Sequence, residues 1–172
     1  MKIQIIGYSG SGKSTLAKKL GQFYNIPYLH LDNVQFFGDW QERTLEEQNK
    51  IVDAFLKEND NWVIDGNYSR VSPIRFEISD ITIFLNYNRF YCYRMCKKRY
   101  KMYKDTSRES CPCKEKLDYQ FKKWILYDGR TKTRKMKHQS NLNKTNGEKL
   151  VFKNLKQLNK WLKEIGYENK SK

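Results

Sequence analysis

The chain has 172 residues, of which 38% are hydrophobic and 31% charged, and its formal net charge at pH 7 is +15. This length suits one domain with its own core and is too short for a multidomain motor. No stretch approaches the roughly 18 unbroken apolar residues of a membrane span. Met1-Lys2 leads into a strand-like run instead of the apolar region of a signal peptide. We therefore expect a single cytoplasmic domain over residues 1–172, with no membrane partner.

Positive charge is concentrated in the second half of the chain. Residues 1–86 carry 9 Lys and Arg against 11 Asp and Glu, which leaves 25 against 8 in residues 87–172. Such a surface attracts anions, whether nucleotide or nucleic acid. A composition rich in lysine also gives basic, solvated helices without any partner. The arginines are the more informative part, because a guanidinium group binds phosphate in a bidentate manner.

Apolar runs and helical periodicities alternate along the chain. The runs predict strands at 2–6, 26–32, 61–68, 81–86 and 149–154. The periodicities predict helices at 14–24, 44–56, 89–103, 116–127 and 154–166. Residues 128–148 are polar, without Trp, Phe, Ile or Val, and predict a mobile connection. The alternation indicates an α/β fold with a mainly parallel five-stranded sheet flanked by helices.

The first predicted strand leads directly into a phosphate-binding loop. Residues 7–14, Gly-Tyr-Ser-Gly-Ser-Gly-Lys-Ser, fit the P-loop pattern G-x-x-x-x-G-K-[ST] between a strand and a helix. In this motif backbone N–H groups surround phosphate oxygens, the lysine reaches the β and γ phosphates, and the final hydroxyl binds Mg²⁺. We therefore expect ATP and Mg²⁺ as cofactors. The expected nucleotide-binding residues are Gly7, Ser9, Gly10, Ser11, Gly12, Lys13, Ser14 and Thr15.

Two aspartates close predicted strands. Asp32 ends "YLHLD" and Asp65 ends "WVID". The carboxyl ends of parallel strands meet at one edge of a sheet, so both should lie near the phosphate loop. A carboxylate there can position Mg²⁺ or accept the proton of an attacking hydroxyl. An aspartate that only begins a turn is the alternative for either one.

The four cysteines, Cys92, Cys96, Cys111 and Cys113, fall in one short region, unlike the spread of a disulfide framework. We expect reduced thiols. A zinc-bearing lid is the alternative, although Cys111 and Cys113 are separated by one residue where zinc sites use two to four.

Several segments carry a resemblance to a known family. "WVIDGNYSR" looks like the strand-to-loop segment of adenylate kinases. The chain as a whole is similar to the DNA topology modulation protein (FlaR-like) family, an adenylate-kinase-like branch of P-loop proteins, through "GYSGSGKSTLAKKL", "IPYLHLD", Trp40, "WVIDGNYSR", "FLNYNRFYCYR" and "FKKWILYDGRTKTR". This resemblance implies a P-loop NTPase fold with a basic helical lid over about residues 88–138.

The resemblance also implies roles for single residues. Asp65 would orient Mg²⁺ through water, and Asp32 would hold the acceptor hydroxyl. Arg70 and Arg75 would be arginines on the acceptor side. The lid arginines that close over the nucleotide would come from Arg94, Arg99, Arg130 and Arg134. If the helix at 116–127 continues past Gly129, Arg130 and Arg134 would share a face and could bind one phosphate group together.

The first functional hypothesis is an ATP-dependent phosphotransferase acting on a nucleotide or on a small hydroxyl compound. Its catalytic residues would be Lys13, Asp32, Asp65, Arg94, Arg130 and Arg134, with Mg²⁺ on Ser14 and Asp65. Loops 33–43 and 67–79 would form the acceptor pocket. The aromatic Trp40 and the arginines Arg70 and Arg75 would belong to it. A guanine-reading N-K-x-D motif is absent from the sequence, which argues against a regulatory GTPase.

The alternative hypothesis is a nucleotide-dependent protein that binds nucleic acid or regulates DNA topology. Residues 87–138 carry 17 Lys and Arg against 5 Asp and Glu, a net charge of +12 that could lie on a phosphate backbone. Interleaved tyrosines there could stack on bases, although at helical spacing they also form a packing face.

Overall fold

The computed structural model describes residues 1–38 and 40–167, and the centre of this part is a five-stranded sheet. The strands lie in the order β2-β3-β1-β4-β5, and each neighbouring pair is parallel. In chain order they are β1 (Lys2–Gly7), β2 (Tyr28–His30), β3 (Trp62–Asp65), β4 (Ile81–Leu85) and β5 (Glu148–Phe152). The predicted α/β fold with a mainly parallel five-stranded sheet is confirmed.

Helices connect these strands, because a parallel pair requires a crossover from the end of one strand to the start of the next. The connecting helices are α1 (Lys13–Tyr24), α2 (Leu31–Gln35), α3 (Leu45–Glu58), α4 (Ile74–Glu77), α5 (Arg89–Tyr103), α6 (Tyr119–Leu126), the 3-10 helix η1 (Asp128–Arg130) and α7 (Lys132–Asn143). Helix α8 (Leu155–Glu164) follows β5. The five predicted helices correspond to α1, α3, α5, α6 and α8. None of the described helices has the length and apolar character needed to cross a bilayer.

Strand β3 illustrates how the sheet is buried on both faces. Val63 packs in a cluster with apolar residues of β1 and β4, whereas Trp62 and Ile64 pack in a second cluster with residues of α2 and α3. Successive side chains of a strand point to opposite faces, so one strand contributes to both clusters. Buried apolar strands of this kind are typical of a parallel sheet covered by helices.

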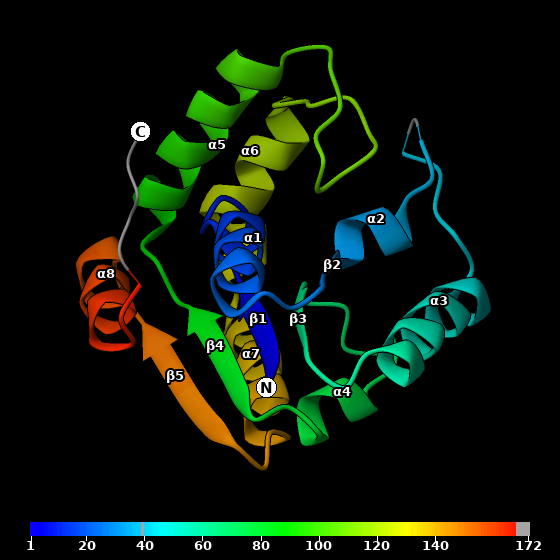
Figure 1. The fold of residues 1–172 in the computed structure, drawn as a ribbon. Helices are drawn as coiled ribbons and strands as arrows, with labels where there is room; N and C mark the ends of the chain where they lie inside the picture. The colour runs from blue at the N-terminus through cyan, green and yellow to red at the C-terminus, as the bar shows by residue number, and fades with distance from the viewer. Residues whose placement is uncertain (39, 168–172) are drawn as a thin grey trace.

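The carboxyl ends of the strands point toward one edge of the sheet, and α5 and α6 lie beyond that edge (Figure 1). Ile5 of β1 is paired with Asp65 of β3, so the loop that follows Gly7 begins beside the end of β3. The fold therefore brings the phosphate loop and the Asp65 carboxylate together.

Local capping interactions define several helix ends. The side chain of Thr44 accepts a hydrogen bond from the backbone N–H of Glu47, and the Glu47 carboxylate accepts one from the backbone N–H of Thr44. This capping box opens α3 where the sequence predicts it. Asn154 caps α8 by accepting a hydrogen bond from the N–H of Gln157.

The second predicted strand is wrong in extent. The strand expected at 26–32 ends at His30, because Leu31 begins the short helix α2. Leu31 and Val34 lie one helical turn apart and are both buried in the second cluster, which favours a helical turn over a longer strand. Asp32 therefore lies in the first turn of α2 and does not close a strand.

Residues 128–148 do not form the mobile connection that their composition predicts. They form η1, α7 and the first residue of β5. Helix α7 buries His138, Asn141 and Leu142, and Thr131 caps its N-terminus. The inward face of α7 is mainly polar, so the apolar periodicity used to recognise helices is missing from the sequence.

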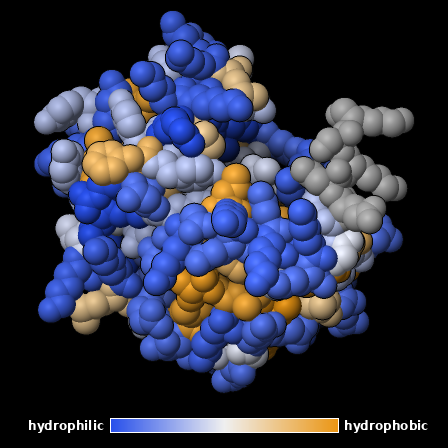
Figure 2. All heavy atoms as spheres, turned by 90° about the vertical axis from the view of Figure 1, so that its left-hand side faces the viewer, coloured by the Kyte–Doolittle hydropathy of each residue, from blue (hydrophilic) through white to orange (hydrophobic). Residues whose placement is uncertain are grey.

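The surface that carries β5 and α8 is largely hydrophilic and contains one hydrophobic patch (Figure 2). Among the described residues of these two elements, Val151 and Leu155 are large apolar side chains that are exposed. Neither β5 nor α8 contributes a residue to the cavity described below.

Candidate active site

The phosphate loop follows β1 in a conformation that depends on its glycines. Gly10 and Gly12 have φ values of 77° and 89°, in the left-handed region that glycine adopts without strain. A Cβ atom on Gly10 would lie 2.4 Å from the carbonyl oxygen of Cys92 and 2.6 Å from the Sγ of Cys96. The loop is therefore packed directly against α5, where no larger residue fits at position 10.

Lys13 and Ser14 occupy the first turn of α1, at the end of the loop. The Lys13 ammonium donates a hydrogen bond to the carbonyl of Tyr8 at 3.3 Å, so the side chain folds back across the loop. Ser11 is buried, and its N–H donates to the Tyr8 carbonyl at 3.1 Å. Thr15 is exposed on the same turn of α1. The arrangement leaves the N-terminus of α1 facing the position where phosphates bind in such loops.

Asp65, at the end of β3, contacts two polar side chains at once. Its Oδ2 accepts a hydrogen bond from the Ser14 hydroxyl at 2.9 Å, and its Oδ1 pairs closely with Nδ1 of His30. Both His30 and Asp65 are buried. The hydroxyl and the carboxylate are oxygen ligands of the kind that Mg²⁺ prefers, and they lie side by side at the phosphate loop. The two residues expected to hold the metal therefore fit that role.

His30 is a functional candidate that sequence reasoning missed. It ends β2, and its imidazole orients the Asp65 carboxylate toward Ser14. Such outer contacts fix the geometry of metal-binding carboxylates. The histidine stands in "YLHLD", but only the pairing of β2 with β3 brings His30 level with Asp65.

Asn67 is a second missed residue, and it ties the phosphate loop to β3. The N–H of Gly7 donates to Asn67 Oδ1 at 2.9 Å, and Asn67 Nδ2 donates to the Gly7 carbonyl at 2.7 Å. These two hydrogen bonds satisfy both backbone groups of the residue that begins the loop. The position of the asparagine directly after "DG" gave no hint of this partner, because the contact crosses between strands.

Asp32 lies in α2 with its Oδ1 accepting a hydrogen bond from the Tyr68 hydroxyl at 2.7 Å. Burial, with the Asp32 carboxylate beside it, raises the pKa of Tyr68 above its ordinary value. Tyr68 therefore stays protonated and remains a donor to Asp32. The structure thus places a second carboxylate on the loop side of the sheet, held by a residue from the segment that follows β3.

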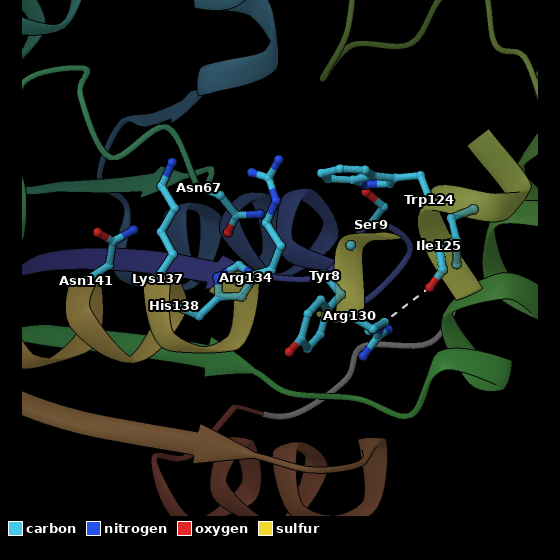
Figure 3. A pocket seen from close by; sticks show the side chains of 11 residues that line it. Tyr8, Ser9, Asn67, Trp124, Ile125, Arg130, Arg134, Lys137, His138 and Asn141 are labelled. Atoms are coloured by element: carbon cyan, nitrogen blue, oxygen red, sulfur yellow. Dashed lines mark hydrogen bonds between the residues drawn. The ribbon is translucent and has the colours of Figure 1, made fainter. Parts of the chain in front are cut away.

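A cavity of about 110 Å³ opens beside the phosphate loop, between it and α7 (Figure 3). We call it the α7 cavity. Arg134 and Lys137 extend side by side from α7 in this view, and the Trp124 ring of α6 lies next to Arg134. The guanidinium of Arg134 is 4.9 Å from the centroid of that ring. The residues that line the cavity are Tyr8, Ser9, Asn67, Trp124, Ile125, Gly129, Arg130, Arg134, Lys137, His138 and Asn141.

Arg130 and Arg134 both reach this cavity, but not through one continuous helix. Helix α6 ends at Leu126, and Arg130 belongs to η1 while Arg134 belongs to α7. Arg130 is buried, donates to the Tyr87 carbonyl at 2.7 Å and lies 3.5 Å above the Tyr8 ring. The expectation that the helix continues past Gly129 is wrong, since Thr131 caps a new helix there.

Other predicted site residues lie apart from this cavity. Arg94 is exposed on α5, near the ring of Tyr91. Arg99 donates to the carboxylate of Glu115 at 2.8 Å and so braces the connection between α5 and α6. Arg70 is exposed in the loop after β3. Neither Arg94 nor Arg99 lines the cavity, and their role in a lid that closes over the nucleotide stays a prediction.

Arg75 does not have the acceptor-side role that the resemblance implies. It is completely buried in α4, and its guanidinium donates to the carbonyls of Val71, Ser72 and Tyr68. Burial lowers the pKa of Arg75 to about 9. A guanidinium that is shielded from solvent and committed to backbone carbonyls cannot bind a substrate, so this prediction is corrected to a structural role.

Trp40 lies near the connection between α5 and α6. Its backbone N–H donates to the Sγ of Cys113 at 3.3 Å, and the Lys116 ammonium lies 4.4 Å from the centroid of its ring. The ring is 41% exposed, which leaves it accessible from solvent. A role for Trp40 in binding the acceptor stays a prediction.

The four cysteines are free and buried. Burial raises the pKa values of Cys92 and Cys96 beneath the phosphate loop, and it raises the pKa of Cys111 to about 11. The thiols of Cys92, Cys96 and Cys111 are therefore protonated and serve as packing groups. In residues 1–38 and 40–167 no group of three or more His, Cys, Asp or Glu side chains is arranged to hold a metal ion, so the zinc alternative gains no set of ligands.

No protein-family model and no curated protein matches the chain. Solved structures do match. A deoxyadenosine kinase from M. mycoides with bound dATP is 13% identical with a TM-score of 0.52, and the alignment covers 96% of this chain and all of that one. A shikimate kinase from Bacteroides thetaiotaomicron is 16% identical with a TM-score of 0.54, covering 95% and 94% of the two chains.

An uncharacterized protein from Eubacterium ventriosum is similar to the same degree, at 16% identity and a TM-score of 0.51, with 96% and 98% coverage. At these identities the likeness establishes the fold. The narrower resemblance to DNA topology modulation proteins stays a prediction from the sequence. The chain has the P-loop α/β fold that is found in deoxyadenosine kinase and shikimate kinase.

Proposed function

We propose that the chain is a phosphotransferase that uses ATP and Mg²⁺ and transfers the γ-phosphoryl group to a nucleotide or to a small molecule with a hydroxyl group. The contact between Ser14 and Asp65 at the phosphate loop supports this most strongly. A carboxylate beside a phosphate site repels the phosphate unless a cation lies between them. The pair therefore favours a loop that binds a metal–nucleotide complex.

The phosphate loop supplies binding and orientation. Backbone N–H groups at the start of α1 surround the phosphate oxygens, and Lys13 leaves the Tyr8 carbonyl to reach the β and γ phosphates. Ser14 and Asp65 would hold Mg²⁺, and His30 contacts the Asp65 carboxylate and would keep it in place. When bound, the metal neutralises charge on the phosphoryl oxygens.

Asp32 is the residue that we assign to the acceptor hydroxyl. Tyr68 donates to one of its carboxylate oxygens, which leaves the other free to accept the proton as the hydroxyl attacks. Arg134, whose guanidinium lies at the α7 cavity beside the loop, would stabilise charge that develops during transfer. The deoxyadenosine and shikimate kinases that share the fold are consistent with phosphoryl transfer to a hydroxyl group.

The test is a screen for ADP release with Mg²⁺ and ATP against nucleosides, nucleoside monophosphates and small hydroxyl compounds. The purified chain should release ADP above its background rate with at least one acceptor, and Lys13→Ala should lose this activity and bind ATP weakly. Lys50→Ala, an exposed lysine of α3, is the control and should behave like the unaltered chain. Thermal melts verify that each variant folds. Activity that survives Lys13→Ala would contradict the proposal.

A further inference from the structure

The α5–α6 connection, residues 104–118, is anchored on the first half of the chain through Glu109. The Glu109 carboxylate accepts hydrogen bonds from Lys18 at 2.5 Å and from Tyr28 at 2.7 Å. Its backbone carbonyl accepts one from the side chain of Asn33 at 2.7 Å. Figure 1 shows the connection leaving the end of α5 and descending on the side of α2, in agreement with these contacts. The middle of the connection therefore rests on α2, next to the segment expected to bind the acceptor.

The tip of the connection is buried against the same region. Cys111 and Cys113 are only 3% and 1% exposed. The Sγ of Cys113 accepts a hydrogen bond from the backbone N–H of Trp40 at 3.3 Å. Burial raises the pKa of Cys111 to about 11, and the charge of Asp32 acts in the same direction. Cys111 is also among the groups that raise the pKa of Tyr68. The tip therefore lies beside the hydrogen-bonded pair of Asp32 and Tyr68.

An internal scaffold gives the tip its shape. The Glu115 carboxylate is 5% exposed and pairs with Arg99 at 2.7 Å and with Arg108 at 2.8 Å. Arg108 and Cys111 exchange two backbone hydrogen bonds of 3.0 Å, which close a tight turn. Breaking a buried ion pair by removing one partner is strongly destabilising. We therefore expect the tip to keep its shape whether or not it rests on α2.

The anchor is much weaker than the scaffold. The side chains of Lys18 and Glu109 are 43% and 55% exposed, and an exposed ion pair contributes little to stability. The connection can therefore leave α2 at small cost while its scaffold stays intact. Asp32 is the residue assigned to the acceptor hydroxyl, and the tip lies beside it, so the position of the connection affects whether an acceptor can reach Asp32.

We infer that the α5–α6 connection is an autoinhibitory segment, which occupies the acceptor side of the site at Asp32 and has to be released from its Glu109 anchor before the acceptor binds. When only a fraction of the molecules is competent to bind, the apparent affinity falls by that fraction. Loosening the anchor should therefore strengthen acceptor binding, whereas loosening a lid that closes over bound substrate should weaken it. The inference rests on the proposed function for the identity of the excluded ligand, but the covering of Asp32 can be tested without a ligand.

Access to position 32 can be measured by thiol alkylation. Asp32→Cys is treated with iodoacetamide, and the modified peptides are quantified by mass spectrometry. Adding Glu109→Ala should speed alkylation at position 32 by about two- to fivefold, the change expected from the loss of exposed polar contacts. Adding Glu58→Ala, at an exposed position that ends α3, is the control and should leave the rate unchanged. Cys92 and Cys96 beneath the phosphate loop should keep their rates in every variant, which excludes global unfolding as the cause.

The natural cysteines of the tip give a second measurement that does not depend on Asp32→Cys folding. In the otherwise unaltered chain, Glu109→Ala should speed alkylation of Cys111 and Cys113 by a similar factor. Lys18→Ala combined with Tyr28→Phe removes the same side-chain hydrogen bonds from the other partner and should have the same effect. Unchanged rates at position 32 and at both cysteines would overturn the inference.

Activity tests whether the covering is inhibitory. With an acceptor found in the screen for ADP release, Glu109→Ala should lower the acceptor KM by about two- to fivefold and leave kcat and the KM for ATP unchanged. A higher acceptor KM would overturn the inference, because the connection would then act as a lid that holds the substrate. If no acceptor is found, the proposed function is lost, and the alkylation rates still decide whether the connection covers Asp32.

Discussion

Asp65 connects three parts of the chain through two short contacts. It receives the Ser14 hydroxyl from α1 and the His30 imidazole from β2, while it ends β3 itself. A buried carboxylate with these partners is held in one orientation. The geometry of the proposed metal site therefore comes from side chains that are far apart in the sequence.

Asp65→Asn should lower turnover by about a hundredfold or more, because the amide removes the charge that positions Mg²⁺ and leaves the backbone of the phosphate loop in place. ATP affinity should change much less than the rate. Steady-state kinetics and nucleotide titration separate the two quantities. Asp60→Asn, at an exposed position just before β3, serves as the control. A near-normal rate for Asp65→Asn would reduce Asp65 to a residue that ends a strand.

Helix α7 shows that an element can be specified by polar contacts. Arg134, Lys137, His138 and Asn141 recur at helical spacing, and all four line the cavity. Neutral His138 packs against the Tyr8 and Phe84 rings, at centroid distances of 4.9 and 5.1 Å. The helix is held against the sheet by this imidazole together with Leu142.

Stability should depend on pH through His138. Its pKa is about 4 in the folded chain and about 6.5 when unfolded, so the unfolded state binds more protons between these values. The contribution is fully present above pH 6.5 and is lost as the pH falls toward 4, by about 3 kcal/mol in total. Urea unfolding across this range measures it. His138→Gln should flatten this part of the pH dependence, and an equal slope in the variant would refute the assignment.

Helix α4 depends on hydrogen bonds from the buried Arg75 guanidinium to backbone carbonyls. Arg75→Met should lower the free energy of unfolding by about 3 kcal/mol or more, because it leaves several buried carbonyls without their donor. Denaturant titration is the measurement. The nearby exposed Arg70→Ala should change stability little. If Arg75→Met is instead stable and raises the KM for an acceptor, Arg75 binds substrate after all.

At the scale of the molecule, the connection between α5 and α6, residues 104–118, reaches back to the first half of the chain. The Glu109 carboxylate accepts hydrogen bonds from Lys18 at 2.5 Å and Tyr28 at 2.7 Å, and its backbone carbonyl accepts one from Asn33. The hydrogen bond from Lys18 is the main cause that lowers the pKa of Glu109. These hydrogen bonds of Glu109 join the basic half of the chain to the half that carries the phosphate loop.

Glu109→Ala should remove the side-chain hydrogen bonds from Lys18 and Tyr28. Backbone amides within 104–118 should exchange with solvent faster, because this segment opens locally before the chain unfolds globally. The increase should be only several-fold, since exposed contacts of this kind contribute little individually. Amides of β1 and β4 should keep their protection. Hydrogen exchange with mass spectrometry provides the measurement, with Glu148→Ala in the edge strand β5 as the control. Equal exchange of 104–118 in both variants would show that other contacts hold the segment.

The sequence by itself determined the parts of this protein that depend on local order. The glycines, Lys13 and Ser14 specify the phosphate loop through backbone freedom and adjacent groups, and the apolar runs specify the parallel sheet. The capping residues Thr44 and Asn154 mark helix starts because their partners lie only three residues away.

Only the tertiary structure decided which polar side chains meet. His30 and Asn67 acquire their roles from strand pairing, and Arg75 loses its expected role through burial that no local pattern reveals. Helix α7 escaped prediction because its inward face is polar, and its residues become intelligible only beside the phosphate loop and Trp124. Hydrogen bonds and charges act over a few ångströms in space, irrespective of separation along the chain, and folding alone sets those distances.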